Sequence, residues 1–402
     1  MTVGSARPLR GLINTVYLPV FASTVGLGML IPVLPLYLTE EGLSLQMTSV
    51  VLAGLGIGAA LGGLPAGGLV AKYGERVVMI GALILLAVST ALLGVTTTAL
   101  ALLALRLASG AAGVALRLSR QTYITRGVPV YVRGRAMAVF GGSFRLSLLF
   151  GPLLGGLLVD QVGFAATFVV AGLFALVGLI PALLRPETPS PEQSPQAEPP
   201  EGLFTSLRRH WRSLTVAGVV PMLVMTVREG RFVVVPLIGD ELGLSATEVG
   251  ALVAVGTGAE LGLFPLAGWI MDRYGRLHAM VPAFGLIGVG LTIIGLADST
   301  AAVVLGGAVV GVGNGLSSGT MLTLGSDLAP EESPGPFLAG MAVFQDAGRV
   351  IGPLLVGVVG SALDLSAAAL SLAIVCAVVI AWLVLVIGDT SPTSSSGKLV
   401  RG

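Results

Sequence analysis

The stretch GGLVAKYGER, from Gly67 to Arg76, is a short charged loop between two apolar runs, and a second copy of it follows later in the chain. Counting on 201 positions from Gly67 leads to GWIMDRYGRL, which begins at Gly268. A glycine and a tyrosine recur at matching places, whereas Ala71 of the first copy stands opposite Asp272 of the second. Because the copies lie half a chain apart, they indicate two homologous halves.

The composition is that of a membrane protein. Hydrophobic residues make up 54% of the 402 residues, charged residues 11%, and the mean hydropathy is +0.95, whereas an average soluble domain is about 25% charged. Apolar runs of about 20 residues, enough to cross the bilayer core as helices, recur along the chain. The strict alternation of barrel strands is missing. We therefore predict an all-α membrane protein with twelve transmembrane helices in two pseudo-symmetric six-helix bundles. The expected spans are residues 12–38, 46–71, 76–96, 98–127, 135–160, 163–184, 211–238, 246–271, 277–297, 299–328, 335–360 and 364–388.

The domain boundaries follow from one biased segment. Residues 185–210 contain RPETPSPEQSPQAEPPEG, which is too rich in Pro, Glu and Ser to pack, so we predict a cytoplasmic linker there. It separates a bundle at 1–184 from a bundle at 211–388, and residues 389–402 form a tail. Fifteen of the 22 Lys and Arg residues fall in expected cytoplasmic segments and none in an outside loop. The positive-inside rule then places both termini in the cytoplasm of a multi-pass plasma-membrane protein.

The repeated loop resembles a signature of the major facilitator superfamily of secondary transporters. In that family the loop reads Gly, three residues, Asp, Arg, any residue, Gly, Arg. The second copy matches it fully, and the first copy departs from it at Ala71 and Glu75. The gating residues that the resemblance implies are Gly67, Gly74, Arg76, Gly268, Asp272, Arg273, Gly275 and Arg276.

Two further patterns are similar to those of the same family. The fourth span has an Arg ahead of a glycine run, and the fifth span contains GPLLGG, similar to the signature of the drug and proton antiporter branch. Part of that motif recurs 201 positions later in the eleventh span. A kinked, tightly packed helix would also explain the GPLLGG motif, with no implication for transport. The residues expected to let these helices bend are Gly151, Pro152, Gly155, Gly156, Gly352 and Pro353.

The resemblance implies alternating access, in which two bundles rock about a substrate site near the midplane. It implies a small-molecule substrate, protons and the lipid bilayer as partners, no nucleic acid, and a monomer. A proton gradient would supply the energy without a cofactor. Proton-coupled efflux is the expected function. Proton-coupled uptake (symport) of an organic anion is the alternative, and a non-transporting membrane receptor is a remote one.

Charged side chains inside membrane spans are costly and are functional candidates by default. The seven arginines outnumber the three acids. Because guanidinium groups bind carboxylate and phosphate, this surplus favours an anionic or zwitterionic organic substrate. The first span holds no acid, which weakens a multidrug function. The expected substrate-binding or proton-coupling residues are Arg106, Arg117, Arg120, Arg145, Arg228, Glu229, Glu260, Asn314, Asp346 and Arg349.

In the first half, the fourth span carries a cationic stripe. Arg106 and Arg117 are eleven residues apart, which brings them within about 20° of one helix face, and Arg120 lies about 40° to the other side. We expect a cavity wall there. Alternatively, Arg117 and Arg120 extend to the lipid headgroups. Arg145 of the fifth span is expected near the midplane, in the substrate site.

In the second half, three groups of charges differ in their expected partners. Asp346 and Arg349 can form an ion pair across one helical turn. Glu260 has no basic neighbour in its own span, so it is protonated, lies in water or meets an Arg of another helix. It is the leading candidate for the proton site. Neighbouring residues do not face each other on a helix, so Glu229, next to Arg228, is expected to serve another helix or the outer gate.

The second loop is expected to act as a latch. Asp272 lies at a helix C terminus, where the macrodipole disfavours an acid by about 0.3–1 kcal/mol. It should therefore find a partner in the first half, such as a helix N terminus, Arg133 or Arg135. Ala71 cannot do so, and Glu75 is at best a displaced substitute. We expect a one-sided latch, and an inward-open state that is more populated than in relatives with both acids.

The chain lacks the residues that enzymatic chemistry needs. The chain has two histidines, His210 and His278, both in expected cytoplasmic segments, and one cysteine, Cys376. These cannot supply a catalytic triad or a metal site together. The phosphate-binding pattern GxxxxGK[ST] is absent as well. We therefore predict neither an enzyme nor a metal site.

Overall fold

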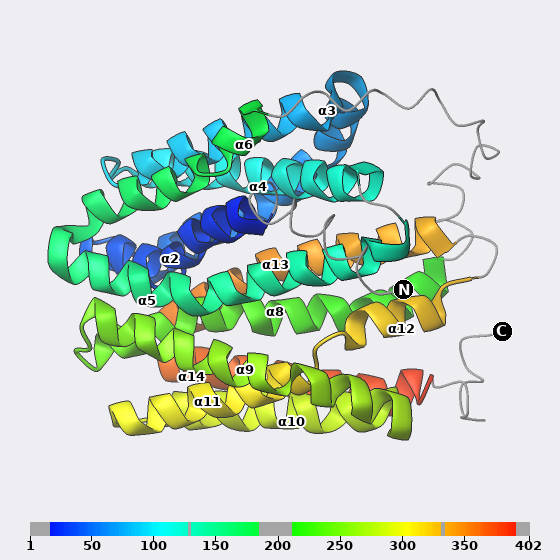
Figure 1. Cartoon of the computed structure of the whole chain (residues 1–402). Coiled ribbons are helices and arrows are strands. Elements are labelled where there is room, and N and C mark those ends of the chain that lie inside the picture. Colours follow the sequence, from blue (N-terminus) through cyan, green and yellow to red (C-terminus); the bar gives the residue numbers. More distant parts are fainter. Residues whose placement is uncertain (1–16, 128–129, 185–210, 331–333, 391–402) are drawn as a thin grey trace. The chain divides into compact units, whose positions relative to one another are not determined.

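The structure is a computed structural model that describes residues 17–127, 130–184, 211–330 and 334–390. Within these ranges the chain is helical and forms no strand. It divides into two compact units (Figure 1). Unit 1 lies within Met1–Pro191 and also takes in Gly243–Ala254; unit 2 lies within Glu192–Leu242 and Val255–Gly402.

Unit 1 contains the first six expected spans in fewer, longer helices. They are α2 (Leu18–Glu40), α3 (Leu45–Leu93), α4 (Ala99–Gly127), α5 (Val130–Leu176) and α6 (Leu179–Leu184). α3 holds two spans that meet at Gly74, where φ is +81°. α5 holds two that meet at Gly163, where φ is +79°. Residues with a Cβ rarely adopt such angles, so glycine makes the change of direction possible.

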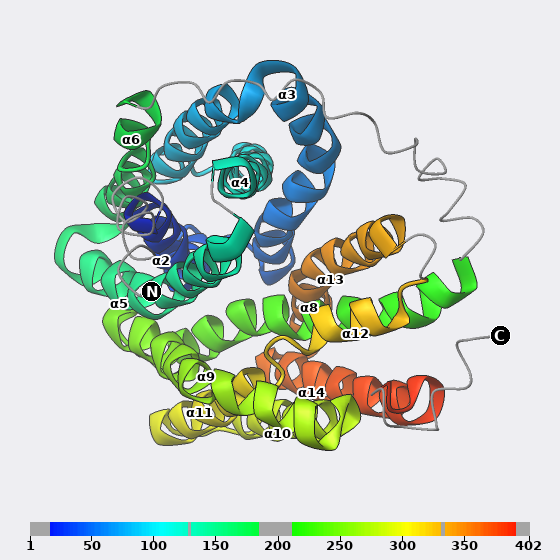
Figure 2. The ribbon, with the colours of Figure 1, turned by 45° about the vertical axis from the view of Figure 1, so that its right-hand side comes forward.

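Unit 2 contains the other six spans. Its helices are α8 (Trp211–Glu241), α9 (Ala246–Tyr274), whose first turns belong to unit 1, α10 (Arg276–Gly295), α11 (Thr300–Leu316), α12 (Thr320–Leu328), α13 (Pro334–Ala362) and α14 (Leu365–Trp382), which continues as a π-helical turn, Leu383–Ile387. α10 lies beside both α11 and α14 (Figure 2).

The tenth span is not the single helix that we predicted over 299–328. It is broken between α11 and α12. The hydroxyl groups of Ser317 and Ser318 both donate to the carbonyl oxygen of Asn314, at 3.0 and 3.2 Å. Gly319 follows with φ at +83°. Side-chain hydrogen bonds of this kind compete with the helix, and the left-handed glycine ends it.

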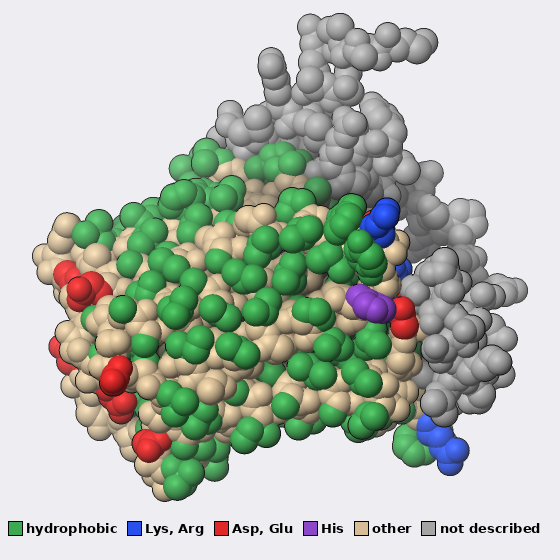
Figure 3. All heavy atoms as spheres, turned by 90° about the horizontal axis from the view of Figure 1, so that it is seen from below, with side chains coloured by type: hydrophobic (Ala, Val, Ile, Leu, Met, Phe, Trp, Pro, Cys, Tyr) green, Lys and Arg blue, Asp and Glu red, His purple; other side chains and the backbone are tan. Residues whose placement is uncertain are grey.

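The helices are suited to a bilayer. Among the described residues, eight helical segments are long and apolar enough to cross it, or nine if a pair bent by 47° within α9 counts as one span. One of the eight, Ala136–Leu183, is long enough for two expected spans. On the face drawn in Figure 3, hydrophobic side chains cover the middle, acidic ones gather at one end and basic ones at the other. This is the surface of an all-α, multi-pass membrane protein.

The two halves of the chain repeat one packing contact. In unit 1, a Cβ on Gly151 of α5 would lie 2.7 Å from backbone atoms of Gly28 in α2. In unit 2, a Cβ on Gly352 of α13 would lie 2.5 Å from the carbonyl oxygen of Thr226 in α8. Small residues let helix backbones approach this closely. Pro152 and Pro353, expected to bend these helices, lie within continuous α5 and α13.

Candidate functional site

Unit 2 brings an arginine of α8 and the acid of α9 together. Arg231 lies within α8, and its side chain is 11% exposed. Its Nη2 lies 3.5 Å from Oε2 of Glu260, whose side chain is 16% exposed. Of the three expected settings for Glu260, the structure therefore shows the third, in which the acid meets an Arg of another helix. Arg231 was one of the seven arginines within spans, but its role as that partner was not predicted.

α11 adds polar groups to the same place. Nη2 of Arg228, one turn before Arg231 on α8, donates to Oγ of Ser317 at 3.1 Å. A Cβ on Gly315 would lie 2.8 Å from the carbonyl oxygen of Glu260, so α9 and α11 touch through their backbones here. Three helices thus converge. We call the set of Arg228, Arg231, Glu260, Asn314 and Ser317 the three-helix cluster.

Several polar atoms of the three-helix cluster have no partner among the described residues. The side chain of Asn314 is one case: the residue is 1% exposed, and neither its amide oxygen nor its amide nitrogen is hydrogen-bonded. The Nε atoms of Arg228 and Arg231 are buried without a partner as well. An unsatisfied buried polar group costs about 1–3 kcal/mol. Each such group calls for an explanation, and a bound water, ion or ligand would supply the missing partners.

The remaining charges of unit 2 are placed differently. Nη1 of Arg349 donates to Oδ1 of Asp346 at 2.6 Å, one turn away on α13. This confirms that the two residues can form an ion pair with each other. Glu229 is partly buried on α8. That it contacts another helix or the outer gate stays a prediction.

In unit 1, the cationic stripe is mostly buried. Arg120 is 6% exposed, and its Nη2 donates to Oγ of Ser23 in α2 at 2.8 Å. The alternative in which Arg120 extends to the headgroups is therefore wrong, because a hydroxyl of α2 offers an acceptor inside the bundle. Arg106 is also 6% exposed, whereas Arg117 is exposed. Arg145 is partly buried on α5.

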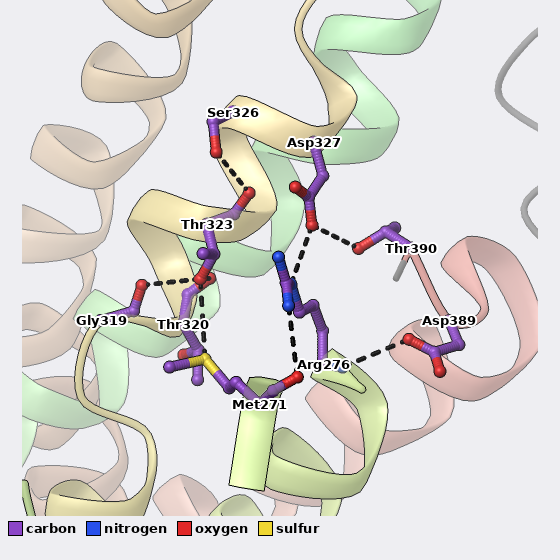
Figure 4. Close-up of polar contacts among 9 residues, drawn as sticks. All are labelled: Met271, Arg276, Gly319, Thr320, Thr323, Ser326, Asp327, Asp389 and Thr390. Atoms are coloured by element: carbon purple, nitrogen blue, oxygen red, sulfur yellow. Dashed lines mark hydrogen bonds and ion pairs between the residues drawn. The ribbon is translucent and has the colours of Figure 1, made fainter. Parts of the chain in front are cut away.

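The second-half loop forms a polar network within unit 2 (Figure 4). Nε of Arg276 lies 3.0 Å from Oδ2 of Asp327 in α12, and Nη1 donates to the carbonyl oxygen of Met271 at 3.2 Å. The backbone N–H of Arg276 donates to Oδ1 of Asp389 at 3.2 Å, and the hydroxyl of Thr390 donates to Asp327. Asp327, an acid near the end of the span expected at 299–328, was not among the expected site residues.

The other loop residues include the expected latch. Asp272 and Arg273 are exposed, and Gly275 has φ at +97°. The side chains of Arg133 and Arg135, the expected partners of Asp272, lie outside the described part. The one-sided latch and the populated inward-open state therefore stay predictions.

The first-half loop binds a helix end of its own unit. Nε of Arg76 donates to the carbonyl oxygen of Ala182 at 3.0 Å, and Nη2 donates to that of Leu183 at 2.6 Å. Both carbonyls are at the C terminus of α6, where a cation satisfies free carbonyls and the helix dipole. Gly67 and Gly268, at the start of each loop, have no atom near an added Cβ among the described residues. Close packing therefore does not explain either glycine.

Comparisons with known proteins agree with this architecture. The family model of the Major Facilitator Superfamily matches residues 16–335 and 219–401. Multidrug resistance protein 1 of Bacillus subtilis (strain 168) is 24% identical over 374 residues, which cover 90% of this chain and 94% of that protein. Enterobactin exporter EntS of Shigella boydii is 30% identical over 266 residues, covering 62% of this chain and 61% of that protein.

Solved structures show the same fold. The nucleoside transporter NupG aligns with a TM-score of 0.74 at 14% identity, covering 91% of this chain and 96% of that one. A bacterial homolog of the human lysosomal transporter Spinster, in an inward-facing and unoccupied conformation, aligns with a TM-score of 0.73 at 15% identity, covering 93% and 94%. With the family model matching most of its length, this chain belongs to the major facilitator superfamily.

Proposed function

We propose that the chain is a proton-coupled exporter of a small organic anion or zwitterion, working by alternating access. Its family makes it a secondary transporter of a small-molecule substrate. One relative is named an enterobactin exporter and another a multidrug resistance protein. The fifth-span motif GPLLGG and the surplus of arginine over acid in the spans favour export of an anion. The proposal includes a plasma-membrane monomer with both termini in the cytoplasm and no cofactor.

The three-helix cluster carries the proposal. Its two arginines share one acid: Glu260 pairs with Arg231 at 3.5 Å, while among the described residues no carboxylate pairs with Arg228. One guanidinium is thus placed to hold a substrate anion beside a carboxylate that already has a cationic partner.

The coupling follows from competition at this cluster. A substrate anion that reaches Arg228 also attracts Arg231, one turn away, and so weakens the hold of Arg231 on Glu260. A carboxylate that loses its cation in a site shielded from water takes up a proton more readily, and one that regains the cation releases it. Binding of the anion and of a proton thereby favour each other at one acid, which is the linkage that symport uses, so the cluster also supports the symport alternative, and the vesicle experiment decides between the two.

Everted membrane vesicles separate export from uptake. Vesicles that contain the protein are given an acidic interior, and a radiolabelled organic anion is added outside. Accumulation of the anion together with loss of internal protons is the expected result. Accumulation only under the opposite gradient would instead establish uptake by symport. Vesicles carrying the Glu260→Gln variant should accumulate none, whereas a Ser371→Ala variant on α14 serves as a matched control.

A further inference from the structure

α11 packs against α10 and α9 on either side of Asn314. A Cβ on Gly313 would meet the carbonyl oxygen of Ala283 in α10 at 2.5 Å, and one on Gly315 would meet α9. At 100° per residue, Asn314 lies between these two directions. It shares its side of the helix with Ser317, which receives the hydrogen bond from Arg228. The amide of Asn314 and the guanidinium of Arg228 therefore face the same region of unit 2.

The two side chains offer complementary unfilled groups. The carboxamide of Asn314 has two N–H donors and an acceptor oxygen, and neither atom is bonded to a described residue. Arg228 offers its Nε–H, which is buried and unbonded. Ser317 holds the guanidinium in place, because its hydroxyl accepts from Arg228 and donates to the carbonyl oxygen of Asn314. The region thus has one cation and one group that both donates and accepts.

The two groups lie within reach of one small ligand. Ser317 follows Asn314 by three residues, a rise of about 4.5 Å along the helix, and its Oγ lies 3.1 Å from Nη2 of Arg228. A ligand with its two polar groups on neighbouring carbon atoms is the smallest that offers one group to each side chain. The smallest group that both accepts from and donates to a carboxamide is a hydroxyl.

We propose that Arg228 and Asn314 recognise a 2-hydroxycarboxylate, in which Arg228 binds the carboxylate and Asn314 binds the hydroxyl on the next carbon. This inference rests on the proposed function and names the class of its substrate. A carboxylic acid without that hydroxyl leaves the buried amide unpaired, so the site discriminates between the two acids.

Matched pairs of acids test this. Purified full-length protein in nanodiscs is titrated with succinate and malate, with tricarballylate and citrate, and with 3-phenylpropionate and phenyllactate; the second of each pair carries the hydroxyl. In at least one pair the hydroxy acid should bind about tenfold tighter, as one to two good hydrogen bonds provide. In the Asn314→Leu variant that ratio should fall to about one. The Arg228→Gln variant should lose both members of the pair.

Controls keep the test decisive. Leucine has the branched shape of asparagine without its polar atoms, so Asn314→Leu removes an unpartnered buried amide, and the smaller Asn314→Ala variant repeats the test without adding volume. The hydroxyl of Ser371 donates to the carbonyl oxygen of Ala368 in its own helix and to no other described residue, so Ser371→Ala should keep the wild-type ratio. An unchanged ratio in both Asn314 variants would overturn the inference, while loss of binding in Arg228→Gln would leave the proposed function standing. If no acid binds the wild type, the inference falls; if everted vesicles also move no anion, the proposed function falls with it.

Discussion

The ion pair between Arg231 and Glu260 should reveal itself in a double-mutant cycle. Removing one partner of a buried ion pair leaves the other charge uncompensated, which costs about 3–5 kcal/mol when burial is complete. Here the side chains keep 11% and 16% exposure and the contact is 3.5 Å. We therefore expect Arg231→Met or Glu260→Leu alone to lower the unfolding free energy by about 2–3 kcal/mol.

The double variant should behave differently from the sum of the two. Replacing both partners with apolar residues is often close to neutral. Arg231→Met/Glu260→Leu should thus lie within about 1 kcal/mol of the wild type, which gives a coupling free energy of about 3–6 kcal/mol. Accumulation driven by a pH gradient should be absent in all three variants, because the acid that links the two gradients is missing or has lost its cation.

The chain carries its own probe for this measurement. Cys376 is the only cysteine and is 1% exposed, so a thiol-reactive fluorescent dye labels it only when unit 2 opens. Melting curves of the four proteins then give the cycle. Additive losses in the double variant would refute the pairing, and normal proton-driven transport by the double variant would refute its role in coupling.

Three further variants test other contacts. Gly275→Ala should destabilise unit 2 by about 1–2 kcal/mol, because φ is +97° and the added methyl meets the carboxylate of Asp389; an unshifted melting curve would contradict this. Ser23→Ala should lower stability by about 1–3 kcal/mol by leaving Arg120 only its longer bond to the carbonyl oxygen of Pro19, at 3.4 Å, whereas Ser371→Ala should not. Burial, followed by neighbouring acids, raises the pKa of Glu241 above 4.5, so the folded state holds more protons than the unfolded state. Stability should therefore fall as pH rises through and above 4.5, and Glu241→Gln should reduce that fall.

The architecture was accessible from the sequence because it depends on patterns that recur. The loop that begins at Gly67 returns at Gly268, and Gly151 returns at Gly352, each 201 positions later. The lengths of the apolar runs then predicted the transmembrane spans. The break at Gly319 escaped prediction because two serines and a glycine are tolerated inside an apolar run. Only the structure shows that both hydroxyls bond to Asn314.

The partners of the charged residues were harder to predict. Helical geometry places neighbours only within one helix, which is why the pair at Asp346 and Arg349 was accessible. Arg120 meets Ser23, which lies 97 residues away. Glu260 of α9 likewise has its partner on a different helix, Arg231 of α8. Which residues of two helices face each other depends on their packing, which no spacing in one helix reveals.

The central claim is that Glu260 links proton movement to anion movement. Proteoliposomes that contain the Glu260→Gln variant, loaded with the acid that binds the wild type best, measure this directly. Two rates are compared, anion accumulation driven by a pH gradient and exchange of labelled for unlabelled anion without a gradient. The account predicts that the variant loses gradient-driven accumulation while exchange persists. Accumulation at the wild-type rate would contradict it.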